Sequence, residues 1–227
     1  IDGTEITAQK GQTILAAADE AGIYIPRLCN MDGLESFGAC RVCTVLVNGR
    51  PQSACTQPAQ PGIVVENDTE ELLDMRKQLI EMLFVEGNHY CMSCEKSGNC
   101  ELQALAYRFG IASPRFPYMF PEREIDASHP EVLVDRNRCV LCGRCVRASR
   151  DVDGKNVFQF TGRGAAKKIS VNATSRLADT ALKSADKAVD ACPVGSILKK
   201  EVGFAVPIGE RLYDHKPIGS EIESKSE

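Results

Sequence analysis

Runs of β-branched and apolar residues, separated by turn signals, predict short strands around one helix in the first 67 residues. Asn48-Gly49, the pair most typical of a two-residue hairpin turn, closes one run, and Asp2-Gly3 is a second turn signal. The predicted helix covers Thr13–Ala21 and ends before Gly22. The expected strands are Thr4–Thr7, Val42–Val47, Gln52–Cys55 and Gly62–Glu66. Strands around one helix suggest a β-grasp domain.

A helical pattern follows this region. Apolar residues at helical spacing form one stripe, which predicts a helix over Thr69–Glu86. Asp68 and Glu71 resemble a capping box at its start, and Gly87 is expected to follow its last turn. The stripe consists of Leu72, Met75, Leu79 and Leu83.

The rest of the chain predicts a mixed region after a short helix over Glu101–Phe109. Ser113–Pro130 carries four of the eleven prolines, with aromatic residues between them, and we interpret it as a stiff connector. After Glu201 we expect a tail with a mobile end. The other expected elements are a strand over Val132–Val134, a helix over Cys142–Arg150, a hairpin of Val157–Phe160 with Lys168–Val171, and a helix over Ser184–Ala191.

Composition narrows the class of protein. Apolar residues make up 43% of the chain and charged residues 26%, and no run of 18 apolar residues occurs, so no membrane span is expected. The formal net charge of −4 gives no basic excess, so no nucleic-acid partner is expected. The unusual feature is eleven cysteines beside only three histidines. Their repeated C-x-x-C spacing predicts thiolates bound to iron or zinc in a cytoplasmic protein rather than a disulfide scaffold.

Two sets of four cysteines have the spacing of iron–sulfur ligands. The first set suits a [2Fe–2S] cluster, with a four-thiolate zinc site as the alternative. The other set combines C-x2-C-x2-C with a distant Cys-Pro, as in bacterial ferredoxins, and suits a [4Fe–4S] cluster. The first set is Cys29, Cys40, Cys43 and Cys55, and the other, here called the third set, is Cys139, Cys142, Cys145 and Cys192. Cys192 could instead serve a neighbouring cluster, as the fourth Cys does in two-cluster ferredoxins.

Three cysteines remain, and a cubane cluster needs a fourth ligand. His89 lies two positions before Cys91, whereas His129 and His215 are far away in sequence. We therefore expect a second [4Fe–4S] cluster on the middle set, which is His89, Cys91, Cys94 and Cys100. A surface histidine, or one that supports a ligand without binding iron, is the alternative for His89.

The sequence lacks the motifs that would predict catalysis by this chain. The sequence has no G-x-G-x-x-G or Walker-type phosphate loop and no nucleophile arrangement, so we expect no NAD or FMN site and no catalytic residue on it. Clusters move single electrons, so hydride chemistry would belong to partner chains. Four arginines surround the third set, and we interpret them as a solvated helix face rather than as residues that tune a cluster. They are Arg138, Arg144, Arg147 and Arg150.

The order of these ligand sets, with Gly87–Cys100 and Ser113–Tyr118, resembles the small diaphorase (gamma) subunits of NAD-reducing nickel–iron hydrogenases. It is also similar to the N-terminal region of the large iron–sulfur subunit of respiratory NADH dehydrogenase, in which three residues separate the histidine from the first cysteine. Here only Tyr90 does so. The respiratory subunit continues into a large further domain, and the end of this chain therefore favours the hydrogenase family.

The resemblance implies an electron-relay subunit, without catalytic residues, in a cytoplasmic hetero-oligomer that couples hydrogen oxidation to NAD reduction. It implies one [2Fe–2S] and two [4Fe–4S] clusters on the ligands named above. FMN, NAD and the nickel–iron site are expected on partners, namely a flavin- and NAD-binding diaphorase subunit and the hydrogenase small subunit. The relay subunit of an NADH dehydrogenase or a formate dehydrogenase, and a structural zinc-binding module, are the alternatives.

The expected fold is α+β in four parts. A β-grasp ferredoxin-like domain (1–67) precedes a helical domain with one His and three Cys ligands (68–115). A bacterial-ferredoxin-like α+β domain (116–205) and a tail (206–227) follow.

Overall fold

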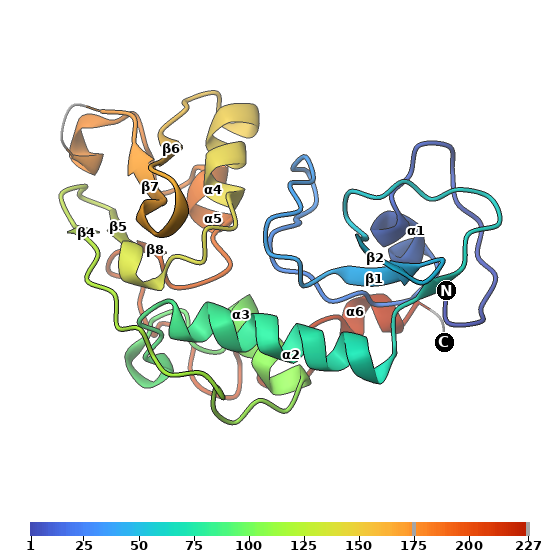
Figure 1. The fold of residues 1–227 in the computed structure, drawn as a ribbon. Coiled ribbons are helices and arrows are strands. Elements are labelled where there is room, and N and C mark those ends of the chain that lie inside the picture. Colours follow the sequence, from blue (N-terminus) through green and yellow to red (C-terminus); the bar gives the residue numbers. More distant parts are fainter. Residues whose placement is uncertain (174–175, 226–227) are drawn as a thin grey trace.

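Three small antiparallel sheets organise the chain, in a computed structural model that describes residues 1–173 and 176–225. The first sheet has the order β2-β1-β3, the second β4-β5-β8, and the third is the hairpin β6-β7. Figure 1 shows the first sheet and the second and third sheets on opposite sides of the molecule, with helix α2 running beneath both. The strands are β1 (Thr44–Val47), β2 (Arg50–Ser53), β3 (Val65–Glu66), β4 (Ile125–Asp126), β5 (Val132–Asp135), β6 (Phe158–Thr161), β7 (Lys168–Val171) and β8 (Ile197–Lys199).

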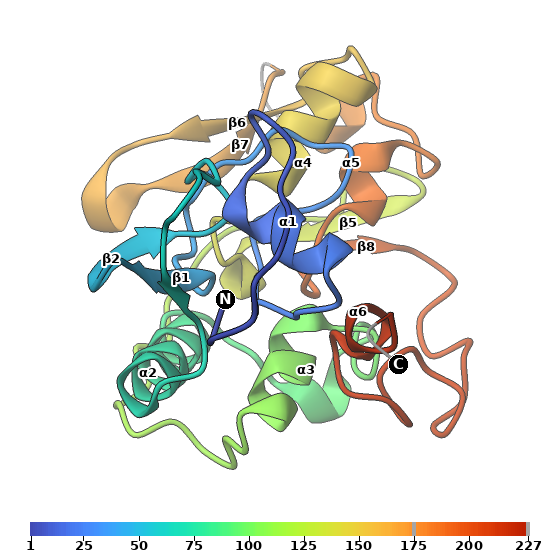
Figure 2. The same ribbon diagram turned by 90° about the vertical axis from the view of Figure 1, so that its right-hand side faces the viewer.

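Six α-helices lie among the described residues and are mostly short. Seen from the side, α2, α3 and α6 form the base of the molecule, below α1 and the sheets (Figure 2). The α-helices are α1 (Ile14–Glu20), α2 (Glu70–Val85), α3 (Glu101–Arg108), α4 (Arg144–Arg147), α5 (Lys187–Asp190) and α6 (Ser220–Glu223). Single turns of other helix types are η1 (Cys91–Ser93), η2 (Arg136–Arg138), η3 (Ala148–Val152), η4 (Gly164–Ala166) and η5 (Leu177–Asp179).

The first region has the predicted helix and hairpin. Thr13 caps α1, because its hydroxyl accepts a hydrogen bond from the backbone N–H of Ala16 at 3.2 Å. Strands β1 and β2 pair with Val47 opposite Arg50, so Asn48 and Gly49 form the two-residue turn with φ of 50° and 76°. The hairpin prediction is therefore confirmed, although β2 begins and ends two residues earlier than expected.

The strand expected over Thr4–Thr7 is wrong. The turn before it is present, because the N–H of Thr4 donates to the carbonyl of Ile1 at 2.8 Å and Asp2 and Gly3 both have positive φ. Among the described residues, however, no strand lies across that turn to provide a hydrogen-bonded ladder. The segment therefore stays irregular, as a strand needs a partner for its backbone groups.

Helix α2 differs from its predicted form in two ways. Its N-cap is Thr69, whose hydroxyl accepts from the N–H of Leu72 at 3.2 Å, and not Asp68. Its buried positions include Leu72, Arg76 and Ile80. The predicted apolar stripe is therefore only partly buried: Met75, Leu79 and Leu83 are half-exposed. Arg76 takes a core position because its guanidinium donates to the backbone carbonyls of Asn67 and Thr44 and to the side-chain oxygen of Asn67, at 2.8–2.9 Å.

The second half of the chain follows the predicted order with shorter helices. Helix α3 and strand β5 lie where expected, while the helix predicted over Cys142–Arg150 becomes α4 followed by the wide turn η3. The helix predicted over Ser184–Ala191 is reduced to α5. The predicted hairpin is present as β6 and β7, with Thr161 opposite Lys168.

Two clusters of buried apolar side chains form the core. One lies inside the first region, between α1 and the first sheet, and includes Ile14 and Val45. The other extends from Tyr24 through α2 and α3 to the second sheet and includes Ile218. The tail is therefore packed up to α6, where Arg108 pairs with Glu223, contrary to the expectation of a mobile end; residues 226–227 lie outside the described residues.

Candidate metal centres

The first cysteine set gathers where the loop before β1 meets the end of β2. The backbone N–H of Cys29 donates to Sγ of Cys40 at 3.3 Å. The hydroxyl of Ser53 lies 3.4 Å from Sγ of Cys43 and 3.3 Å from Sγ of Cys55. The structure therefore brings the four predicted cysteines together. It also adds Ser53, which the sequence did not single out because a serine in a strand carries no spacing signal.

The four thiols lie close enough to change one another's acidity. The pKa of Cys29 is lowered because the thiols of Cys40 and Cys55 hydrogen-bond to its thiolate. The pKa of Cys43 is lowered by the thiol of Cys55 in the same way. The pKa values of Cys40 and Cys55 are raised in return. The four thiols are thus close enough for the protonation of each to depend on the others, as expected for side chains that could bind one metal group.

The middle set lines one cavity. His89, Cys91, Cys94 and Cys100 border it, together with side chains from α2, α3 and η2. Burial raises the pKa of Cys100 to about 12, so its thiol needs a metal partner in order to be a thiolate at neutral pH. The structure therefore brings the four predicted residues of this set together.

His89 is the histidine that has an unused ring nitrogen in the interior. Its Nε2 is buried and has no hydrogen-bond partner, while the ring packs edge-on against Phe84 at 5.5 Å between centroids. Burial, with the charges of Arg138 and Arg123, lowers the pKa of His89 to about 4, so the ring is neutral at pH 7, the form that binds metals. By contrast, both ring nitrogens of His129 are within hydrogen-bond distance of backbone groups.

Gly87 makes room for this imidazole. A Cβ atom at position 87 would lie 2.6 Å from Nε2 of His89 and 2.9 Å from the carbonyl oxygen of Asn137. The residue follows the end of α2 as predicted, but it has no positive φ. Its absence of a side chain therefore serves the close approach of His89 rather than a left-handed helix end.

The third set lines a separate cavity. Cys139, Cys142, Cys145 and Cys192 border it, with apolar side chains of β5, β7 and β8. The cavity places Cys192 with the other three cysteines of its own set and not with His89. Burial raises the pKa of Cys142 to about 12 and raises that of Cys145 well above its usual value, as expected for thiols in an apolar shell.

The arginines around the third set are not a solvated face. Arg144 and Arg147 are buried, with 3% and 5% exposure, and only Arg150 is largely exposed. Nη1 of Arg144 pairs with Glu101 at 2.5 Å. The interpretation as a solvated face is therefore wrong for these two residues, because each is held between elements that are distant in sequence.

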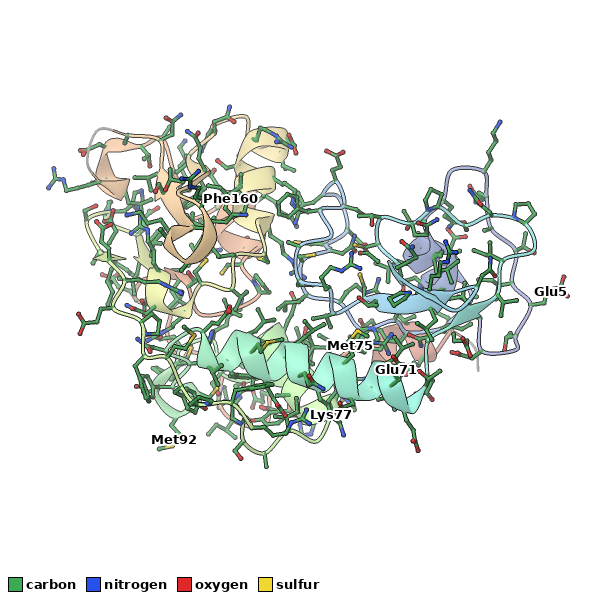
Figure 3. All side chains as sticks on the ribbon, in the orientation of Figure 1. Glu5, Glu71, Met75, Lys77, Met92 and Phe160 are labelled. Carbon is green, nitrogen blue, oxygen red and sulfur yellow. The ribbon has the colours of Figure 1, made fainter. Side chains whose placement is uncertain are left out.

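Arg147 joins the first and third sets. Its Nη2 donates to the backbone carbonyl of Cys29 at 2.7 Å and to that of Cys142 at 3.4 Å. Its guanidinium also lies over the ring of Phe37, 5.5 Å from the centroid, and Phe37 stacks on Phe160 at 5.8 Å. Phe160 lies on the β6–β7 hairpin (Figure 3). Arg147 thus contacts the backbone of one ligand candidate in the first set and of one in the third set.

The middle and third sets each line a cavity. Among residues 1–173 and 176–225, no three His, Cys, Asp or Glu side chains converge closely enough to hold one metal ion. A four-iron cube has a separate iron at alternate corners, so its ligands line a cavity without meeting at one point.

Among residues 1–173 and 176–225, none of the helices has both the length and the apolar character needed to span a bilayer.

Comparison with known protein families finds three matches along the chain. Residues 1–70 match a 2Fe-2S iron-sulfur cluster binding domain. Residues 76–115 match the NADH-ubiquinone oxidoreductase-G iron-sulfur binding region, and residues 129–198 match the ferredoxin-like domain of NADH-quinone oxidoreductase subunit 3. The expected α+β fold with a 2Fe-2S ferredoxin-like domain is thereby confirmed.

Individual relatives point the same way. The chain is 44% identical to the NAD-reducing hydrogenase HoxS subunit gamma of Cupriavidus necator, over 96% of this chain and 93% of that protein. It is 35% identical to the NADPH-Fe(3+) oxidoreductase subunit alpha of Geobacter sulfurreducens, over 90% of this chain but 24% of that longer protein. Among solved structures, a chain in a crystal structure of NAD+-reducing [NiFe]-hydrogenase in the H2-reduced state is 49% identical, with a TM-score of 0.93, over 95% of this chain and 92% of that one.

Proposed function

We propose that this chain, which belongs to the family of gamma subunits of NAD-reducing hydrogenases, is an electron relay. It passes electrons between a hydrogenase module and a flavin- and NAD-binding module. The observation that supports this proposal most directly is that the twelve predicted ligand positions fall into three separate groups within one fold. When bound, iron–sulfur clusters at such sites accept and donate single electrons.

The proposed ligands are those expected from the sequence. A [2Fe–2S] cluster is assigned to the first set, and the contacts that gather its cysteines around Ser53 support this assignment. One [4Fe–4S] cluster is assigned to the middle set, where His89, whose Nε2 is buried and unpaired, borders the same cavity as three cysteines. A second [4Fe–4S] cluster is assigned to the third set, whose four cysteines line one cavity.

The contacts between the sites favour the spatial order first, third, middle. Arg147 touches the backbone of Cys29 in the first set and of Cys142 in the third. The backbone N–H of Glu101, next to Cys100 of the middle set, donates to the carbonyl of Pro193, next to Cys192 of the third, at 2.9 Å. The third set therefore has a contact with each of the other two, which supports a path in which an electron crosses the chain by way of the third set.

The partners follow from what the relay needs at its ends. We propose that FMN and NAD bind to a diaphorase subunit and that a nickel–iron site lies behind a hydrogenase small subunit, all in a cytoplasmic hetero-oligomer. The family membership supports the hydrogenase over the relay subunit of an NADH or formate dehydrogenase. The matches to iron–sulfur binding regions along the chain support clusters over structural zinc.

Purification of the native complex under anaerobic conditions tests this proposal. The chain is expected to co-purify with flavin- and nickel-containing subunits, and the complex is expected to reduce NAD with hydrogen. The chain on its own is expected to carry iron but neither to bind NAD nor to reduce it with hydrogen. Co-purification with a quinone- or formate-linked enzyme, or binding of NAD by the isolated chain, would contradict the assignment.

A further inference from the structure

Arg138 lies between the middle set and the third set. It ends η2, directly before Cys139, and its side chain borders the cavity of the middle set with only 19% exposure. Its Nη1 lies 3.6 Å from Sγ of Cys94, which places a charged donor on a sulfur that is itself a ligand candidate. The same Nη1 donates to the carboxylate of Glu95 at 3.0 Å.

The position of this guanidinium is fixed from several sides. Its Nε pairs with Asp135 at 3.0 Å, and its Nη1 also lies 3.5 Å from the carbonyl oxygen of Gly195. A Cβ atom at position 195 would lie 2.5 Å from Sγ of Cys94. The absence of a side chain at Gly195 therefore allows the segment that carries Cys192 to pack closely against Cys94. Arg138 is held at this contact rather than free to swing into solvent.

The electrostatic consequence has a definite sign. An arginine keeps its positive charge at any pH the protein tolerates. A cluster that takes up an electron becomes more negative, and both a nearby cation and a hydrogen bond to a ligand sulfur stabilise that state. Glu95 and Asp135 act in the opposite direction, because their carboxylates pair with the same guanidinium at 3.0 Å and offset part of its charge.

We propose that Arg138 is a positioning residue that raises the reduction potential of the middle cluster by donating to Sγ of Cys94, with Glu95 as its counterweight. The inference rests on the proposed function, since it requires a cluster on the middle set. It gives this cluster a higher affinity for an electron that arrives from the neighbouring third site than its ligands alone would provide. The arginine thereby biases the step between the two sites.

Redox titration of the complex, followed by electron paramagnetic resonance of each cluster, tests the proposal. Arg138→Met should lower the midpoint potential of the middle cluster, and Arg138→Lys, which keeps the charge, should restore part of the loss. Glu95→Gln should shift the same potential upward. Arg150→Met is the matched control, because Arg150 is exposed and pairs only with Asp151 at 2.6 Å, so no cluster potential should change.

The opposite shifts separate tuning from loss of structure, since a damaged site would not respond with opposite signs. If Arg138→Met fails to assemble the middle cluster, Glu95→Gln decides, and an unchanged or lowered potential there overturns the proposal. Unchanged potentials in both variants, at wild-type iron content, overturn it as well. If the wild-type complex gave the signals of only two clusters, that result would instead contradict the proposed function.

Discussion

Replacing Arg147 by Met is expected to separate the first site from the third. The guanidinium is buried at 5% exposure, and its Nη2 is within hydrogen-bond distance of the carbonyls of Cys29 and Cys142. Methionine fills a similar volume but cannot donate. The two carbonyls would then lose a charged donor in a place where water has little access.

The cost can be estimated from these two acceptors. A buried acceptor without a partner costs about 1–3 kcal/mol. Two such groups give about 2–6 kcal/mol. Since 1.4 kcal/mol is a factor of ten in an equilibrium constant, the contact between the two sites should weaken by about 30-fold to 20,000-fold.

The assay is the rate at which the cluster absorbance of the anaerobic protein decays in a fixed concentration of urea. Arg147→Met should lose the [2Fe–2S] signal at least about tenfold faster than wild type, because opening between the sites exposes Cys29. Arg150→Met, one turn along the chain and solvent-exposed, should decay at the wild-type rate. A less than twofold acceleration in Arg147→Met would refute the reasoning that this cation holds the two regions together.

Three further predictions concern the sites and the fold. His89→Ala should remove the middle cluster and leave the other two, seen as a loss of about four irons per chain with the remaining spectra unchanged; wild-type iron content would count against ligation by His89. Gly195→Ala should also disturb the middle cluster, because its Cβ would lie 2.5 Å from Sγ of Cys94; an unaltered spectrum of that cluster would show that the contact is not tight. Burial alone would raise the pKa of Asp126, but hydrogen bonds from hydroxyl and backbone donors lower it overall. The stability that Asp126 contributes is therefore present above its unfolded pKa of about 3.9 and is lost as pH falls through its lower folded value. The difference in urea midpoint between wild type and Asp126→Asn should accordingly shrink in acid, and a difference that grows there would contradict this sign.

The ligand sets could be predicted because metal binding leaves a spacing in the sequence. C-x2-C places two sulfurs on one short loop whatever the surrounding fold, so the cysteines of each set lie near one another as expected. The missing fourth ligand that pointed to His89 is arithmetic of the same kind, and His89 borders the cavity of the three remaining cysteines. Local signals such as Asn48-Gly49 also act within a few residues and were correctly interpreted.

The features that the sequence did not predict share a different cause, because each depends on contacts between segments that are distant in sequence. Arg147 looks like a solvated helix residue until the loop carrying Cys29 folds against it. Arg76 occupies a core position because its two Nη atoms donate to the backbone carbonyls of Asn67 and of Thr44 in β1. Neither Arg138 nor Ser53 has a sequence pattern that reveals its proximity to sulfur. The tail likewise packs through residues near α6 that only tertiary structure brings to Arg108.

The metal content of the anaerobically purified chain tests the central claim most directly. One [2Fe–2S] and two [4Fe–4S] clusters predict about ten irons per chain, an equal amount of acid-labile sulfide, and no stoichiometric zinc. A colourless chain that carries zinc instead of iron would contradict the account, and so would a chain with about six irons, since one of the two cubane sites would then be misassigned.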